Sequence, residues 1–204
     1  LVTVNPLMND LSFIGIDHQG CFAEYISVPI QNVYKIKTNN YKLAAYIEPI
    51  AASLAPLKAN LSGLIHVYGT NRIAKLTAKI LQLAGLDVVL IEPKTLAPNS
   101  CATIIETMMD EDSIEEISRL LKPEGTLVLK SRYPNKIPVN LYSFVKKDIT
   151  IKSCYYYDFQ KTIDFALKYE TFFEDLFGAE FSLEQYSQAF NENLNAEKKI
   201  FLRL

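Results

Sequence analysis

Residues 64–93 read LIHVYGTNRIAKLTAKILQLAGLDVVLIEP, and this stretch decides the fold. An apolar run, Leu64–Tyr68, is followed after a short turn by apolar residues at helical spacing from Arg72 to Ala84. Gly85 stands where a helix commonly ends in the left-handed conformation. A second apolar run, Val88–Ile91, follows at once. The pattern therefore predicts a β-α-β unit with two parallel strands.

The turn inside this unit matches a nucleotide-binding frame in part. In G-x-G-x-x-G units the first strand turns into a helix whose N-terminal amides hold a pyrophosphate. Gly69 supplies the first glycine, and Ala74 replaces the third, which only has to allow close packing of helix on strand. Asn71 replaces the second. Asn tolerates positive φ at a cost of about 1–2 kcal/mol, but its side chain stands where phosphate oxygens approach the backbone.

An acidic residue ends the second strand. Glu92 lies 23 positions after Gly69 and fits the residue that accepts hydrogen bonds from the adenosine ribose hydroxyls, which favours NAD over NADP. The alternative, a β-α-β unit without a ligand, remains open. The candidate cofactor-binding residues are Gly69, Thr70, Asn71, Arg72, Ile73 and Glu92.

Composition limits the class of protein. A chain of 204 residues with 49% hydrophobic content can bury about 70% of its unfolded surface. Its formal net charge of −2 gives no sign of a nucleic-acid partner. The three cysteines are odd in number and far apart, which favours a reducing, cytoplasmic location without disulfides. No uncharged apolar run approaches the roughly 20 residues that span a membrane, so no membrane association is expected.

The flanking segments predict further elements. Leu1–Val4 reads as a short strand. Gly15–Ile36 is β-prone, with Phe22 and Tyr25, and predicts at least two antiparallel strands. Tyr41–Asn60 reads as a helix that Pro49 kinks or restarts. In the sheet, Val67, Val89, Ile105 and Val128 are expected to form the core. Of the histidines, His66 is expected in the core and His18 in an exposed turn.

Several short motifs along the chain occur in a recognisable order. They are Gly20-Cys21-Phe22-Ala23-Glu24-Tyr25, Val28-Pro29, Asn32–Ile36, Glu48-Pro49-Ile50-Ala51, Leu120–Val128, Ile149–Ser153 and Phe181–Phe190 with Lys199-Ile200. In this order and spacing the sequence resembles the zinc-type medium-chain alcohol dehydrogenases, and the threonine and sorbitol dehydrogenase branch in particular.

The resemblance implies an α/β fold: a shortened Rossmann-like parallel sheet flanked by helices, plus the remnant of a GroES-like β domain. The implied domains are residues 1–49 for that remnant, 50–160 for the cofactor domain, and 161–204 for a segment returning to the remnant. NAD is the implied cofactor and a small molecule the implied substrate. In the family the last sheet strand pairs across a dimer axis, which suggests a homodimer through the strand near Tyr155.

The zinc ligands of the family have no counterpart in this sequence. Family enzymes use a Cys and a Gly-His-Glu segment that lie upstream of the first matching strand. Pro6 and Gly20 are joined by thirteen residues without cysteine, where the family carries a structural zinc lobe. Glu48 matches a glutamate near the catalytic zinc, and it is the one catalytic candidate. A single carboxylate cannot hold a catalytic zinc, which takes about three protein ligands, so this chain alone does not support zinc.

The link after Glu92 is short. Only nine residues, 93–101, separate it from the apolar run Ala102–Glu106, where the family has a helix, a strand and another helix. Even one helical crossover takes about a dozen residues, so the sheet is expected to lack its outer strand and to keep the order 2-1-4-5-6 in family terms. The family has a small-residue turn ending in glycine at the place where the nicotinamide ribose packs, and here that turn reads Glu106-Thr107-Met108-Met109.

Two hypotheses for function follow. In the first, the chain is the C-terminal part of a medium-chain oxidoreductase that transfers hydride between NAD and an alcohol or ketone, and a missing N-terminal segment brings the zinc ligands. In the second, it is a degenerate relative that acts as an interaction or assembly subunit. Asn71, the short link and the methionines favour the second hypothesis.

Overall fold

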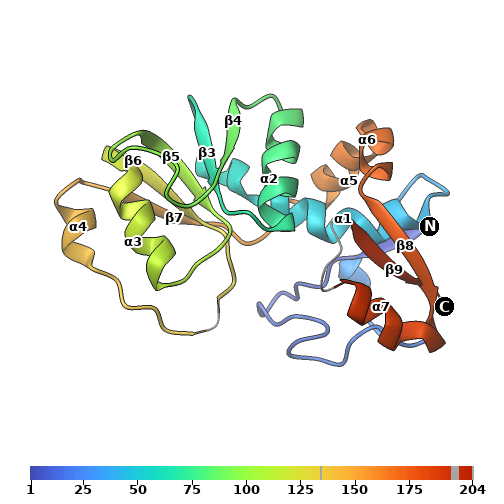
Figure 1. Cartoon of the computed structure of the whole chain (residues 1–204). Coiled ribbons are helices and arrows are strands. Elements are labelled where there is room, and N and C mark those ends of the chain that lie inside the picture. The colour runs from blue at the N-terminus through green and yellow to red at the C-terminus, as the bar shows by residue number, and fades with distance from the viewer. Residues whose placement is uncertain (134, 194–197, 204) are drawn as a thin grey trace. The chain divides into compact units, whose positions relative to one another are not determined.

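The computed structural model describes residues 1–133, 135–193 and 198–203. The chain divides into two compact units (Figure 1). Unit 1 comprises Leu1–Ala51 and Asp158–Leu204, and unit 2 comprises Ala52–Tyr157. The GroES-like origin of the first unit stays a prediction.

Unit 2 is built on a five-stranded sheet in which every neighbouring pair is parallel, ordered β4-β3-β5-β6-β7. In register, Val67 lies opposite Leu90 on one side and Ile105 on the other. The predicted α/β class and the predicted strand order are confirmed. The strands are β3 (Ile65–Tyr68), β4 (Val88–Ile91), β5 (Cys101–Glu106), β6 (Leu121–Leu129) and β7 (Thr150–Ser153).

Helices cover both faces of this sheet, as a parallel sheet requires. On one face, α2 (Arg72–Leu83) buries Ala78 and Leu81 in a cluster with Val67, Ile105 and Val128. The other face carries α3 (Glu111–Leu120) and α4 (Leu141–Val145), whose Ile117 and Phe144 join a second cluster with Ile104 and Leu127. From β3 the chain crosses to β4 at one edge of the sheet, and from β5 it crosses to β6 toward the opposite edge. Because both crossovers are right-handed, α2 and α3 lie on opposite faces of the sheet.

The helix ends follow from their capping residues. Asn71 is the N-cap of α2, and Gly85, at φ +88°, follows its C-cap as the sequence predicts. Asp110 caps α3, where its carboxylate accepts a hydrogen bond from the Ser113 amide at 2.7 Å. Glu111 then opens the first turn of α3, where a negative charge complements the helix dipole.

The link from β4 to β5 contains turns and bends but no helix or strand. Among the described residues, no strand pairs with the outer edge of β4. The expectation that Val89 belongs to the core is wrong, since its side chain is 38% exposed. The physical reason is that β4 is the edge strand of the sheet, with no described strand on its outer side.

Unit 1 contains most of α1 (Tyr41–Leu54), which runs through Pro49 and buries Leu43, Ile47 and Ile50 completely. The single-turn helix η2 (Ala55–Ala59) follows and belongs to unit 2. The remaining elements are β1 (Val2–Val4), η1 (Ile30–Asn32), β2 (Val33–Lys35), α5 (Phe159–Lys168), α6 (Glu170–Glu174), β8 (Phe177–Ser182), η3 (Leu183–Gln185), α7 (Tyr186–Asn193) and β9 (Lys199–Arg203).

The expectation of two antiparallel strands within Gly15–Ile36 is wrong. Only β2 forms there, and it pairs antiparallel with β1. Phe22 and Tyr25 are 66% and 90% exposed. A β-prone segment becomes a strand only when another strand satisfies its backbone hydrogen bonds, and among the described residues only β1 does so, for β2 alone.

Candidate functional site

The Gly69 turn lies at the carboxyl end of β3. The Gly69 amide donates to the Ile91 carbonyl at 3.1 Å, which ties the turn to the end of β4. Gly69 has φ +136°, and a Cβ atom there would lie 2.6 Å from Thr107 Oγ1. No other residue type fits this position without moving a neighbour. The tight turn that a nucleotide site needs is therefore present.

Asn71 adopts an ordinary extended conformation, with φ −73° and ψ 167°. Its Oδ1 accepts a hydrogen bond from the Ala74 amide at 2.8 Å, and its Nδ2 donates to the Thr107 carbonyl at 3.0 Å. The positive φ considered from the sequence is wrong. Because Asn71 serves as a helix N-cap, extended backbone is the conformation it prefers, and no strain arises.

Two residues thus join two turns at the carboxyl edge of the sheet. Thr107 binds the Tyr68 carbonyl through its amide at 3.1 Å and through its Oγ1 at 2.9 Å. Together with the bond from Asn71, these contacts form what we name the Asn71–Thr107 clasp. Asn71 also accepts the hydrogen bond of the Ala74 amide through its Oδ1. That amide is one of the first-turn donors that face an anion at a helix N-terminus.

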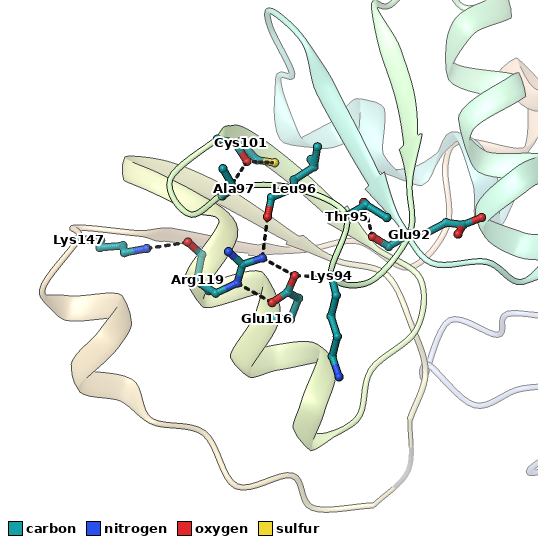
Figure 2. Close-up of polar contacts among 10 residues, drawn as sticks. Glu92, Lys94, Thr95, Leu96, Ala97, Cys101, Glu116, Arg119 and Lys147 are labelled. Atoms are coloured by element: carbon teal, nitrogen blue, oxygen red, sulfur yellow. Dashed lines mark hydrogen bonds and ion pairs between the residues drawn. The ribbon is translucent and has the colours of Figure 1, made fainter.

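The other predicted cofactor residues surround this turn. Thr70 and Ile73 are exposed and Arg72 is half-buried. Glu92 is exposed directly after β4, and its backbone carbonyl accepts from Thr95 Oγ1 at 2.7 Å. Figure 2 shows the Glu92 carboxylate directed away from Lys94. The fold therefore brings Glu92 beside the Gly69 turn, as the spacing predicts.

Glu48 does not belong to this group. It lies half-buried on α1 in unit 1, whereas the Gly69 turn and Glu92 belong to unit 2. All six nucleotide candidates therefore belong to unit 2.

The link after Glu92 is held by two residues of α3 (Figure 2). Arg119 Nη2 donates to the Leu96 carbonyl at 2.8 Å and also to Glu116 Oε1 at 2.7 Å. The same Glu116 oxygen accepts from the Lys94 amide at 3.1 Å. Hydrogen bonding from Arg119 lowers the pKa of the Glu116 carboxyl. Sequence reasoning missed this pair, although its i, i+3 spacing on α3 is a visible signal.

A buried carboxylate supports the carboxyl edge of the sheet further along. Glu106, fully buried at the end of β5, accepts hydrogen bonds on Oε1 from the Lys130 amide at 2.7 Å and from the Ser131 amide at 2.8 Å. Its Oε2 has no hydrogen-bond partner among the described residues. From the sequence, Glu106 was expected only as the end of an apolar run and the start of the following turn, and its buried hydrogen bonds were not predicted.

The residues present do not fit a catalytic zinc site. Within residues 1–133, 135–193 and 198–203, no three histidine, cysteine, aspartate or glutamate side chains gather to hold a metal ion. Burial raises the pKa of the Cys154 thiol to about 11, and burial also raises the pKa of Cys101. Both thiols stay protonated at neutral pH, which suits packing and not nucleophilic chemistry. In the same described ranges, no helix combines the length and apolarity that a membrane span requires.

Comparison with known sequences gives partial matches. No family model matches the chain. L-threonine 3-dehydrogenase of Bacillus subtilis is 27% identical over 122 residues, which cover 56% of this chain and 35% of the relative. The matched part therefore spans about a third of the length of that curated relative.

Solved structures share the fold. A protein of Sinorhizobium meliloti 1021 assigned as a zinc-binding dehydrogenase, bound to NADP, has a TM-score of 0.80 and 18% identity, covering 100% of this chain and 76% of its own. The rspB protein of Escherichia coli CFT073, described as a short chain alcohol dehydrogenase and complexed with NADH, has a TM-score of 0.79 and 18% identity, covering 94% and 67%.

The parallel sheet, the glycine turn and these likenesses define an oxidoreductase-like chain of Rossmann-like architecture. More particularly, the chain resembles the zinc-type medium-chain alcohol dehydrogenases, and their threonine dehydrogenase branch in its sequence.

Proposed function

We propose that the chain is an NAD-dependent oxidoreductase acting on an alcohol or ketone, or the C-terminal part of one. The observation that carries the proposal is the bond from the Gly69 amide to the Ile91 carbonyl at 3.1 Å. It ties the glycine turn to the end of β4, directly before the exposed residue Glu92. Acidic residues in this place bind ribose hydroxyls in dinucleotide sites. Structural neighbours with the same fold were solved with NADP and with NADH.

The residues of unit 2 have distinct roles in this proposal. The α2 N-terminus would face the pyrophosphate, because its first amides and the helix dipole favour negative charge. Glu92 would accept hydrogen bonds from the adenosine ribose and repel a 2′-phosphate. NAD would supply the hydride acceptor. On the substrate side, Glu48 is the candidate that the family resemblance provides.

Asn71 sets the strength of binding in this account. Its Oδ1 already accepts from the Ala74 amide at 2.8 Å, so a phosphate oxygen competes with it for that donor. A cofactor must either displace the amide side chain or bind through fewer backbone donors. We therefore expect NADH to bind more weakly than to a G-x-G-x-x-G site.

The test is a comparison of NADH and NADPH binding in the natural chain and in Glu92→Ser. NADH should bind better than NADPH to the natural chain, and Glu92→Ser should weaken NADH at least about tenfold and remove the preference, because the ribose acceptors are lost. Glu115→Ser, on the exposed side of α3, is the matched control and should change neither affinity. Equal binding of both cofactors in both variants would contradict the role of Glu92.

A second candidate function is a non-catalytic assembly subunit, and the Asn71–Thr107 clasp favours it because the clasp fills the nucleotide turn with the protein's own side chain. The subunit would dimerise through the strand near Tyr155. β7 is an edge strand with Ile151 46% exposed. Ile151→Lys should then convert a dimer to a monomer in sedimentation experiments, because an edge lysine opposes strand pairing. A chain that is monomeric before the substitution contradicts this candidate.

A further inference from the structure

A second group of polar residues gathers at the carboxyl ends of β6 and β7, apart from the Gly69 turn. The two strands end side by side, with Leu129 in register with Ser153. Arg132 follows the first, and Tyr155 and Tyr156 follow the second. The Arg132 guanidinium carbon lies 4.2 Å from the Tyr155 ring centroid and 4.5 Å from that of Tyr156. These distances are well within the range of cation–π attraction, so the two rings orient the guanidinium.

The backbone beneath Arg132 is fixed from inside the sheet. Glu106 Oε1 accepts hydrogen bonds from the backbone amides of Lys130 and Ser131, and it also accepts one from Ser131 Oγ at 3.1 Å. The Cys154 amide donates to the Leu129 carbonyl at 3.0 Å, which continues the β6–β7 pairing up to the tyrosines. The backbone on either side of Arg132 and of the two tyrosines is therefore bonded to the sheet. A binding group held in this way loses little conformational entropy when a ligand arrives.

A second cation lies beside these residues. Lys58 Nζ donates to the Tyr156 carbonyl at 3.2 Å. Arg132 has five N–H donors in a planar fork, so it can keep protein partners and still bind an oxyanion through the remaining donors. Carboxyl ends of parallel strands are also where α/β proteins bind ligands.

We propose that Arg132, oriented by Tyr155 and Tyr156, binds the oxyanion group of the substrate, either a carboxylate or a phosphate. The anion site itself rests only on these contacts, whereas the word substrate rests on the proposed oxidoreductase function. The planar guanidinium matches the two oxygens of either group.

The experiment titrates the full chain, without any nucleotide, with inorganic phosphate and separately with malonate, by calorimetry at constant ionic strength held with chloride. Saturable binding of at least one probe at millimolar concentration or below is expected. Arg132→Gln should weaken it at least tenfold, and Arg132→Lys should fall between because it keeps the charge and loses the fork. Lys146→Gln, an exposed charge loss beyond α4, should leave the affinity unchanged. Tighter binding of phosphate or of malonate assigns the ligand group.

Two results would overturn the site: the absence of saturable binding by either probe, or equal affinity in Arg132→Gln. Tyr155→Leu adds a readout of orientation, since it removes a ring while keeping the cation, and it should weaken binding severalfold. Far-ultraviolet circular dichroism should be the same for all these variants, because the substituted residues Arg132, Tyr155 and Lys146 are exposed. Oxyanion binding in a chain that binds no NADH would uphold the site and overturn its assignment to a dehydrogenase substrate.

Discussion

At the scale of single residues, Asn71 decides how the nucleotide turn behaves. We predict that Asn71→Gly strengthens NADH binding at least about tenfold, because the glycine frees the Ala74 amide and removes the side chain that bonds to Thr107. Glycine is a tolerated N-cap, so α2 should lose only a few tenths of a kcal/mol from the cap, and about 1 kcal/mol from the bond to Thr107. Fluorescence titration measures the affinity and urea unfolding measures the stability.

A matched control for this substitution is Asn140→Gly. Asn140 is also a helix N-cap, but its side chain makes no capping hydrogen bond. This variant should leave NADH affinity unchanged. If Asn71→Gly binds NADH no better than the natural chain, the clasp does not limit access to the turn.

His66 predicts a pH dependence of stability. It is buried in β3 with 7% exposure, its Nδ1 has no hydrogen-bond partner among the described residues, and burial lowers its pKa from the ordinary value of 6.5. Just below pH 6.5, His66 is therefore protonated more readily in the unfolded chain than in the folded chain. The contribution of His66 is favourable above that pH and is lost as the pH falls toward the lower folded pKa.

Urea unfolding between pH 5 and 8 checks this sign. The natural chain should lose stability on the acid side by at most about 1.4 kcal/mol per pH unit from this one group. His66→Leu should flatten the loss. A steeper acid loss in His66→Leu than in the natural chain would show that the protonated ring is stabilised in the fold.

Single residues differ in how far the sequence could predict their role. Gly69 and Glu92 lie 23 positions apart within one β-α-β unit, so local spacing was enough to bring them together. The hydrogen bonds that Thr107 makes with Tyr68 and Asn71, and the two tyrosine rings beside Arg132, were not predicted, because these partners come from other strands. The identity of such partners depends on side-chain directions at the sheet edge, which periodicity does not encode.

At the scale of elements, the short link from β4 to β5 depends on α3. We predict that Arg119→Met destabilises the chain by about 1–2 kcal/mol, because the bond to the Leu96 carbonyl and the bonds that orient Glu116 are lost. Hydrogen exchange of the Asn99 amide, which donates to the Arg119 carbonyl at 3.1 Å, should also accelerate. Lys79→Met, on the exposed side of α2, serves as the control. Unchanged stability and unchanged exchange in Arg119→Met would mean that the structure of the link does not depend on Arg119.

The central strand and the edge strand should respond differently to a buried charge. Val67 is fully buried in β3, whereas Val89 in β4 is 38% exposed. Val67→Asp should unfold the chain, because an unpaired buried charge costs several kcal/mol. Val89→Asp should remain folded, since its carboxylate can reach water. Circular dichroism and thermal melting measure both, and a folded Val67→Asp with an unchanged melting temperature would refute the position of β3.

Elements were predictable where hydrophobic period and caps agree. The spacing in residues 72–84 and the capping residues around it fixed α2, and the length of the link after Glu92 ruled out an outer strand. The prediction of two strands in Gly15–Ile36 was wrong because β-prone residues do not show whether a partner strand exists. The prediction that Val89 lies in the core was wrong for a related reason: a strand pattern does not show which strand lies at the edge of the sheet.

At the scale of the whole molecule, fold and activity rest on different grounds. The sheet of unit 2 and the solved structures with the same architecture show a Rossmann-like fold, and the sequence resembles threonine dehydrogenase over part of its length. The aligned part covers only 35% of that relative, so the reaction, the substrate and the dimer remain proposals. Unit 2 by itself contains the Gly69 turn, Glu92 and the Arg132 group, and these can be tested without knowing the rest of the catalytic machinery.

The most direct measurement is a titration of the natural chain with NADH, followed by nicotinamide fluorescence. The chain contains no tryptophan, so no indole emission overlaps the signal. The account predicts saturable binding that NAD displaces and NADP does not, with Asn71→Gly binding more tightly. No binding at millimolar NADH, in the natural chain and in Asn71→Gly alike, would contradict a nucleotide site at Gly69 and Glu92, and it would leave the assembly subunit as the function to pursue.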